Sequence, residues 1–217
     1  MKMYARPEEP GVSRTYIKFT ETIPGRLISA MQPLGKCLVF GCGHSHLPHI
    51  VACLWKDAQV TAYDTDHQKI AEKQHSMRQL HPWPRNLDYT AEQPAQKFDT
   101  VLATNVLHEN PAQLIDESMT FLIAGGMIGV MDYDMKGMPR EDFFQRWVTT
   151  FEEQERKDLG DDRCYAMHTA FGLDDCITQM ELRQVTMITA NGGLQRERWP
   201  EKGTSHFIYA GRSTTEH

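Results

Sequence analysis

The residues with the clearest chemistry are two glycines and a carboxylate that follow two apolar runs. Gly41 and Gly43 come directly after the run 37–40, and Asp64 comes directly after the run 60–63. Glycines at this spacing let the backbone turn sharply and let a ligand approach it closely. A carboxylate about 20 residues further along is suited to accept hydrogen bonds from ribose hydroxyls. The pattern therefore predicts a nucleotide-binding unit.

Two later apolar runs also end in polar groups that can bind an acceptor or move a proton: Asn105, His108, Asp132 and Tyr133. Ligands of an open α/β sheet bind outside the carboxyl ends of the strands, so we expect these side chains at one site. Asp132 and Tyr133 are predicted to contact the acceptor. His108 is a candidate general base, with a positioning or packing role as the alternative.

The segment 164–171 combines Tyr, Met, His and Phe without a helical stripe. We interpret it as the part of a lid, near 135–172, that lines the acceptor pocket. His168 is a second candidate base, again with packing as the alternative. Tyr165 and Tyr16 are further candidate contacts of the acceptor.

The elements that position these groups alternate between strands and helices, which predicts a doubly wound, mostly parallel sheet. Apolar residues recur at helical spacing from 47 to 54, and helices are also expected over 66–80, 114–123, 141–157 and 173–180. We expect glycines 125 and 126 to end the helix 114–123. Seven strands are expected, at 37–40, 60–63, 86–89, 101–103, 127–131, 184–189 and 205–210. The last two lack a helix between them, so they are predicted to pair antiparallel.

Composition limits the class of protein. The chain has 217 residues, which suits one domain that buries about 70% of the surface of its unfolded chain. Its formal net charge of -6 gives no general attraction to nucleic acid. No apolar run approaches the roughly 20 residues of a membrane span, and no signal-peptide core is present. The five cysteines include no CxxC pair, which favours free thiols and a cytoplasmic protein.

The glycine stretch resembles motif I of the class I S-adenosylmethionine-dependent methyltransferases, typically D/E-x-G-x-G-x-G. Gly41 and Gly43 fit this motif, whereas Val39 stands in place of the acid and Ser45 in place of the third glycine. Residues 98–109, FDTVLATNVLHE, resemble motif IV of small-molecule methyltransferases. Both motifs lie in the part of the chain, from about residue 34 onward, that resembles this class.

The resemblance implies a Rossmann-like methyltransferase domain over 34–217, preceded by an N-terminal arm or cap at 1–33. It implies S-adenosylmethionine as the methyl donor and S-adenosylhomocysteine as the product. The residues that it places near the cofactor are Phe40, Gly41, Cys42, Gly43, Asp64, Thr65, Glu92 and Asn105. Little of the chain lies outside the core, so we expect a small-molecule acceptor. A monomer and a homodimer are both compatible with the sequence.

Two alternatives remain. Val39 and Ser45 are compatible with a non-catalytic protein of the same fold that binds the cofactor or a partner. An NAD-dependent enzyme is disfavoured, because His46 stands where the dinucleotide fingerprint needs its third glycine. No metal site is expected: His46 and His49 share a helix face, but no third ligand is evident.

Overall fold

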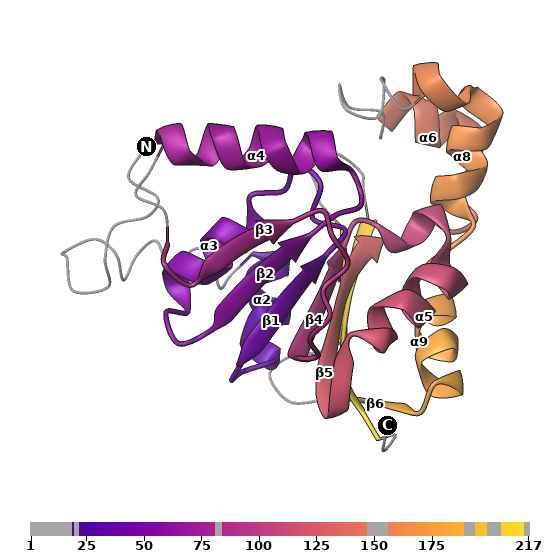
Figure 1. Ribbon diagram of the computed structural model, residues 1–217. Helices are drawn as coiled ribbons and strands as arrows, with labels where there is room; N and C mark the ends of the chain where they lie inside the picture. Colours follow the sequence, from indigo (N-terminus) through magenta and orange to yellow (C-terminus); the bar gives the residue numbers. More distant parts are fainter. Residues whose placement is uncertain are drawn as a thin grey trace.

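The computed structural model describes residues 19, 22–80, 84–146, 156–188, 194–198 and 205–214. Within these ranges, eight strands form one sheet in the order β3-β2-β1-β4-β5-β8-β6, with β7 paired to β8 (Figure 1). The strands are β1 (Lys36–Phe40), β2 (Gln59–Tyr63), β3 (Leu87–Thr90), β4 (Phe98–Thr104), β5 (Leu122–Tyr133), β6 (Val185–Met187), β7 (Leu194–Arg198) and β8 (Ser205–Ser213).

The first five strands are parallel, and their order places the ends of β1 and β4 side by side. β1 pairs with β2 on one side and with β4 on the other, both in parallel register. From β1 the chain adds β2 and β3 on one side, and it then returns to add β4 on the other side of β1. The strand order therefore reverses at the neighbouring strands β1 and β4. Ligands of open α/β sheets bind at such a switch point, outside the carboxyl ends of the strands.

The last strands form the predicted antiparallel edge. β8 runs antiparallel to β5 and to β6, which confirms the expected pairing of the final two strands. β7 is an addition to that prediction: it pairs with residues 205–209 of β8, while β6 pairs with residues 211–213 of the same strand. β6 and β7 therefore lie one after the other along one edge of β8.

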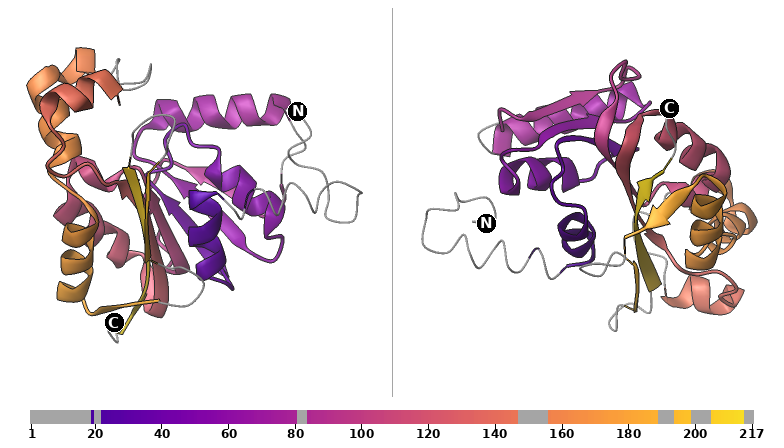
Figure 2. Two further views of the ribbon diagram at one scale, coloured as in Figure 1. Left: turned by 180° about the vertical axis from the view of Figure 1, so that it is seen from behind. Right: turned by 90° about the horizontal axis from the view of Figure 1, so that it is seen from below.

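Helices cover both faces of the sheet, as the burial of four successive residues of β1 requires. Cys37 and Val39 point into a core cluster with α2 (Ile23–Ala30), α3 (Leu47–Leu54) and α4 (His67–Leu80). Leu38 and Phe40 point into a second cluster with α5 (Pro111–Thr120) and α9 (Leu173–Leu182). Figure 2 shows the two helix layers on opposite sides of the strands. The doubly wound architecture is confirmed.

Helix α2 belongs to the core rather than to an arm. Thr22 begins it, and its side chain accepts a hydrogen bond from the Gly25 amide. Leu27 and Ile28 are fully buried, and a Cβ added at Gly129 of β5 would lie 2.3 Å from the sulfur of Met31. The last part of the segment 1–33, which is predicted to be an arm or cap, therefore packs into the core. Tyr16 lies outside the described residues.

The helix expected over 114–123 and its glycine end are wrong. Helix α5 spans Pro111–Thr120, and β5 already begins at Leu122, where it pairs with Phe98 of β4. Gly125 and Gly126 therefore lie inside the strand. The error arises because Leu122 continues the apolar pattern of α5, although its backbone has already joined the sheet.

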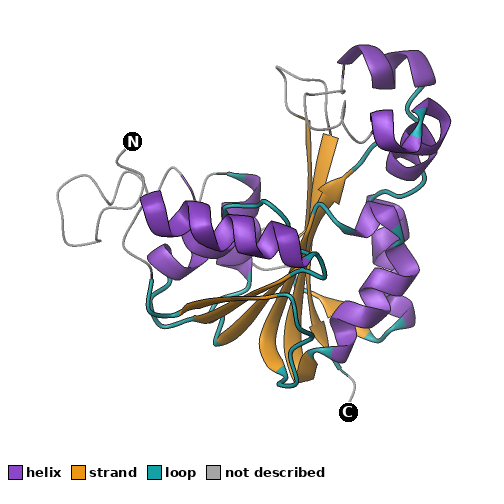
Figure 3. Cartoon of the chain, turned by 45° about the horizontal axis from the view of Figure 1, so that its top comes forward, coloured by secondary structure: helices purple, strands orange, loops and turns teal. Residues whose placement is uncertain are grey.

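The lid region contains helices α6 (Arg140–Arg146) and α8 (Asp161–Thr169), which stand beyond the carboxyl ends of the strands (Figures 1 and 3). Met135, Phe143 and Cys164 form a small core of their own there. The segment 164–171, which lacks a helical stripe in the sequence, is nevertheless helical up to Thr169. The stripe is missing because α8 buries only Cys164 and His168, and one of these is polar. Much of the helix expected over 141–157 lies outside the described residues.

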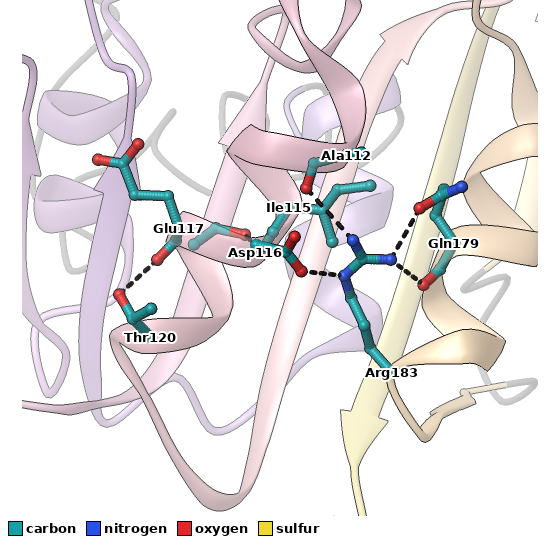
Figure 4. Close-up of polar contacts among 8 residues, drawn as sticks. Ala112, Ile115, Asp116, Glu117, Thr120, Gln179 and Arg183 are labelled. Atoms are coloured by element: carbon teal, nitrogen blue, oxygen red, sulfur yellow. Dashed lines mark hydrogen bonds and ion pairs between the residues drawn. The ribbon is translucent and has the colours of Figure 1, made fainter.

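An arginine joins α5 and α9, the two helices that follow the strand ends of the site. Arg183 donates to the Asp116 carboxylate at 2.6 Å and to the Ala112 carbonyl, and it also donates to Gln179 of α9 (Figure 4). At the other end of α9, the Leu173 amide donates to the Asp134 carboxylate just after β5. These contacts join one end of α9 to α5 and the other end to the residues just after β5.

Within the described parts of the chain, no helix combines the length and the apolar character that crossing a lipid bilayer requires.

Candidate functional site

The glycine turn after β1 has the conformation that its sequence predicts. Gly41 and Gly43 have φ values of +63° and +43°, in the left-handed region that favours glycine. A Cβ at Gly41 would lie 2.6 Å from a methyl carbon of Val106, so this glycine lets the turn pack against the loop after β4. Among the residues that the structure describes, the atom nearest to a Cβ added at Gly43 would be Asp64 Oδ2 at 3.8 Å. A side chain at Gly43 would therefore contact the Asp64 carboxylate.

Asp64 lies against this turn. Its Oδ2 accepts a hydrogen bond from the Gly43 amide at 2.8 Å, and its Oδ1 accepts one from the Asp66 amide at 3.0 Å. Each carboxylate oxygen has a second lone pair. The half-buried Asp64 side chain can therefore accept further hydrogen bonds beside Gly43, as ribose recognition requires.

The side chains of Phe40 and Cys42 point into the core instead of the turn. Phe40 is 3% exposed and packs against Tyr63 and Phe121, with ring centroids 6.0 Å apart in each pair. Cys42 is buried, its amide donates to the Tyr63 carbonyl, and burial raises the pKa of its thiol to about 12, with the Asp64 charge adding to the rise. What these two residues offer a cofactor must come from the backbone.

Three other predicted cofactor contacts are exposed at successive strand ends. Thr65 follows β2, Glu92 follows β3 and Asn105 follows β4. β3 lies two strands from the glycine turn, so Glu92 is the most distant of the three in the sheet order. Asn105 has a φ of +54°, which asparagine tolerates better than most residues, and its amide donates to the Met131 carbonyl of β5.

A buried histidine–aspartate pair lies beyond β4 and β5. His108, in the short helix η1 (Leu107–Glu109), places its Nδ1 2.8 Å from Oδ1 of Asp132. The Asp132 carboxylate also accepts the amide hydrogens of Leu107, His108 and Tyr133. Burial opposes its ionisation, but the facing His108 ring and these amides hold the pKa of Asp132 below its usual range.

This pair bears on the contact predicted between Asp132 and the acceptor. The Asp132 side chain is fully buried, and its oxygens are engaged by His108 and by the backbone. An ionised carboxylate accepts a hydrogen bond, so the Nδ1 of His108 carries a proton. The Asp132 carboxylate therefore fixes the orientation of the His108 ring.

Rings from four elements form a cluster that includes His108. His168 of α8 stacks on it with centroids 4.4 Å apart, and Tyr133 lies edge-on at 5.2 Å. Phe143 of α6 packs against His168 at 6.0 Å, and His206 of β8 packs against Tyr133 at 4.8 Å. The structure therefore brings both candidate bases together and joins the lid to the strand ends.

Tyr165 lies further into the lid. Its hydroxyl donates to the Met138 carbonyl at 2.6 Å, and its ring packs against Phe143 and Phe144. The guanidinium of Arg140 lies 5.6 Å from the ring centroid. These contacts place Tyr165 in the small core of the lid, one helical turn before His168.

Sequence reasoning missed three residues of this region. His206 lies on β8 and joins the ring cluster because β8 pairs with β5, which no local sequence pattern indicates. Burial lowers the pKa of His206, and the Asp132 charge opposes that shift. Phe143 lies in the helix expected over 141–157, and nothing in the sequence connected it with the site. Lys73 on α4 is buried beside the glycine turn, and its place on the apolar face of a predicted helix was a usable signal.

The histidines around the turn do not gather. His44 and His46 are exposed, whereas His49 is buried on α3. Among the residues that the structure describes, no three His, Cys, Asp or Glu side chains are arranged to hold a metal ion.

One family model of known proteins matches the part of the chain that contains much of this site. Residues 38–128 match the family model of a methyltransferase domain. That range begins in β1, includes the glycine turn, Asp64 and His108, and ends within β5. No curated protein matches the chain.

Solved structures share the fold at low identity. A SAM-dependent methyltransferase from Aquifex aeolicus is 13% identical, with a TM-score of 0.55 over 94% of this chain and 93% of that one. Geranyl diphosphate C-methyltransferase from Streptomyces coelicolor A3(2), in complex with Mg²⁺, geranyl diphosphate and S-adenosyl-L-homocysteine, is 9% identical, with a TM-score of 0.59 over 97% and 88%. The [4+2]-cyclase SpnF is 13% identical, with a TM-score of 0.60 over 86% and 78%.

The sequence match and the fold agree with the resemblance: residues 38–128 match the model of a methyltransferase domain, and the chain shares its fold with solved S-adenosylmethionine-dependent methyltransferases.

Proposed function

We propose that this protein transfers a methyl group from S-adenosylmethionine to a small-molecule acceptor. The observation that carries the proposal is the contact between Asp64 and Gly43, 2.8 Å from carboxylate to amide at the end of β1 and β2. It puts an available carboxylate beside Gly43 at the switch point of the sheet. Ribose hydroxyls are donors that fit such a carboxylate.

The residues around the turn fit the nucleoside part of the cofactor. Asp64 lies beside Gly43, and Thr65 and Asn105 are exposed on either side. The usual acid of motif I is absent, since Val39 stands in its place. Val39 is fully buried in the core. The groups that bind the amino-acid end of the cofactor must therefore come from elsewhere in this chain.

The cofactor supplies an electrophilic methyl group on a sulfonium, so the protein chiefly has to hold donor and acceptor in line. In the displacement, a lone pair of the acceptor forms the bond to the methyl carbon, and the carbon–sulfur bond breaks. An acceptor that carries a hydrogen on the attacking atom must also lose a proton. His108 is the group that we assign to take it, at Nε2, because Asp132 fixes its ring and its tautomer.

The ring cluster supports a small acceptor with an apolar part. The rings of His168 and Tyr133 lie against His108, and Phe143 lies against His168, so the surroundings of His108 are largely apolar. A nucleic acid would instead need lysines and arginines at this place. The geranyl diphosphate methyltransferase, whose structure holds geranyl diphosphate, shares the fold and is an example of a small-molecule acceptor with an apolar part.

A second candidate function is favoured by one observation. Val39, fully buried where the motif has an acid, is compatible with a protein that binds the cofactor or uses the fold without transferring the methyl group. The [4+2]-cyclase SpnF has the same fold, so the fold alone does not decide the reaction.

Turnover separates the two candidates. We expect the protein, given S-adenosylmethionine carrying a labelled methyl group, to label members of a panel of small phenols, amines, thiols and carboxylic acids. S-adenosylhomocysteine should form in proportion, and a reaction without acceptor gives the background. Binding of S-adenosylhomocysteine without acceptor-dependent label on any panel member would favour the non-catalytic function instead.

A further inference from the structure

A lysine on the inner face of α4 stands apart from the other charged side chains. Ile70 and Lys73 are 5% and 4% exposed, and their spacing of three residues puts them on one face of the helix. That face covers the sheet, and Ile70 belongs to its core cluster. Lysine is almost never fully buried unless it is paired. A buried ammonium at this position therefore needs a structural or functional reason.

The partner of Lys73 is the backbone of the glycine turn. Its Nζ donates to the His44 carbonyl at 2.7 Å, across 29 residues of sequence. From the other side, β2 holds the same turn: the Tyr63 carbonyl accepts from the Cys42 amide at 3.0 Å, and Asp64 accepts from the Gly43 amide at 2.8 Å. The turn is thus fixed by α4 and by β2 together.

Such fixing matters because the turn contains two residues in left-handed glycine conformations. Glycine loses more conformational freedom on ordering than any other residue. A ligand that binds a loose turn must order it, and that cost weakens the affinity. Bonds from a packed helix and a strand impose the order before the ligand arrives.

We propose that Lys73 is a positioning residue of the cofactor site, whose ammonium holds residues 41–46 in the shape that receives the cofactor. The inference rests on the proposed function, because it takes the turn to be the binding place of S-adenosylmethionine. Lys73 does not contact the cofactor in this account. It acts through the His44 carbonyl, and it compensates for a motif that has two glycines in place of three.

The charges around Lys73 agree with this placement. Burial lowers the pKa of Lys73, and the nearby Cys42 thiol opposes that shift. Burial and the charge of Lys73 both lower the pKa of His46 at the end of the turn. Burial and then Asp64 raise the pKa of the Cys42 thiol, while Lys73 opposes the rise. The ammonium therefore lies close to Cys42 and His46, which both belong to the turn.

The test compares Lys73→Met with Lys69→Met. Methionine has a similar length and suits the apolar face of α4, so the melting temperature of Lys73→Met should stay near that of the wild type. Its affinity for S-adenosylhomocysteine, measured by calorimetric titration, should fall about tenfold. Lys69 lies one turn earlier with its side chain 45% exposed, in an ion pair with Asp66 at 3.7 Å. Its replacement should change neither quantity appreciably.

Hydrogen exchange tests the tether without any cofactor. In the ligand-free protein, the amides of Gly43, Ser45 and Leu47 should exchange faster in Lys73→Met than in Lys69→Met. Unchanged exchange and unchanged affinity in Lys73→Met would overturn the proposal. If the wild type bound no S-adenosylhomocysteine, the proposed function would fail, while the exchange rates would still report whether Lys73 holds the turn.

Two further measurements separate positioning from a merely structural role. The wild-type affinity should decline at alkaline pH before an exposed lysine would lose its proton, since burial lowers the pKa of Lys73. This decline should be absent in Lys73→Met; an identical pH profile in both proteins counts against the proposal. If Lys73→Met did not fold, Lys73→Gln, which retains a donor without the charge, should show the same weaker binding and faster exchange.

Discussion

Replacing His108 with glutamine is expected to lower the turnover number by about 10²–10⁴-fold, the contribution typical of a general base. The affinity for S-adenosylhomocysteine should stay close to that of the wild type. The reason is that Asp132 holds the Nδ1 of His108 at 2.8 Å and so orients the imidazole that we assign as the base, whereas a glutamine amide is not basic. Steady-state kinetics with an acceptor from the panel, together with titration of the cofactor product, measures the two effects separately.

The matched variant for this prediction is His168→Gln. His168 stacks on His108 at 4.4 Å but belongs to the lid, and no bond to Asp132 orients it. Its replacement should raise the KM of the acceptor more than it lowers the turnover number. If His168→Gln abolished turnover and His108→Gln did not, the roles of the two histidines would be reversed.

Replacing Asp64 with alanine is expected to weaken the binding of S-adenosylhomocysteine by about 1.5–3 kcal/mol, the range of a hydrogen bond to a charged group. That free energy corresponds to an affinity loss of roughly 10- to 150-fold. The variant removes the acceptor that we assign to the ribose hydroxyls and also releases the Gly43 amide. Calorimetric titration gives the dissociation constant, and a thermal melt reports any loss of folding.

Asp66→Ala is the control for this second prediction. Asp66 lies two residues further along the same loop, where its Oδ1 accepts from the Gln68 and Lys69 amides at the start of α4. Its loss should lower the melting temperature slightly, as the loss of a helix cap does, and leave the affinity unchanged. Equal effects of Asp64→Ala and Asp66→Ala on affinity would show that the loop, rather than the Asp64 carboxylate, matters for binding.

The sheet could be predicted because its signals are local. The apolar runs at β1, β2, β4 and β5 end in glycine or polar residues, and the strands lie where those runs are. β7 was missed because Leu194–Arg198 carries charged residues and gains its pairing only from β8. Helix α8 was missed for a related reason: it buries one apolar and one polar side chain, so its sequence lacks an apolar stripe.

The sequence could predict which residues of the site lie near one another, but not the contacts between them. The expectation that His108, Asp132 and Tyr133 lie near one another follows from their places at the ends of parallel strands, and His168 was expected there as part of the lid. The ring and hydrogen-bond contacts agree with both expectations. The bond from His108 to Asp132 depends on the depth of each side chain, which strand order does not specify. The link from Lys73 to His44 spans two elements, and the sequence offered only the oddity of a lysine on an apolar helix face.

The central claim is that the turn at Gly41–Gly43 and the Asp64 carboxylate bind the adenosyl cofactor, and calorimetric titration of the wild-type protein tests it most directly. The account predicts that S-adenosylhomocysteine binds with one site per chain and that NAD gives no measurable heat under the same conditions. No binding of S-adenosylhomocysteine, or binding of NAD in its place, would contradict the account.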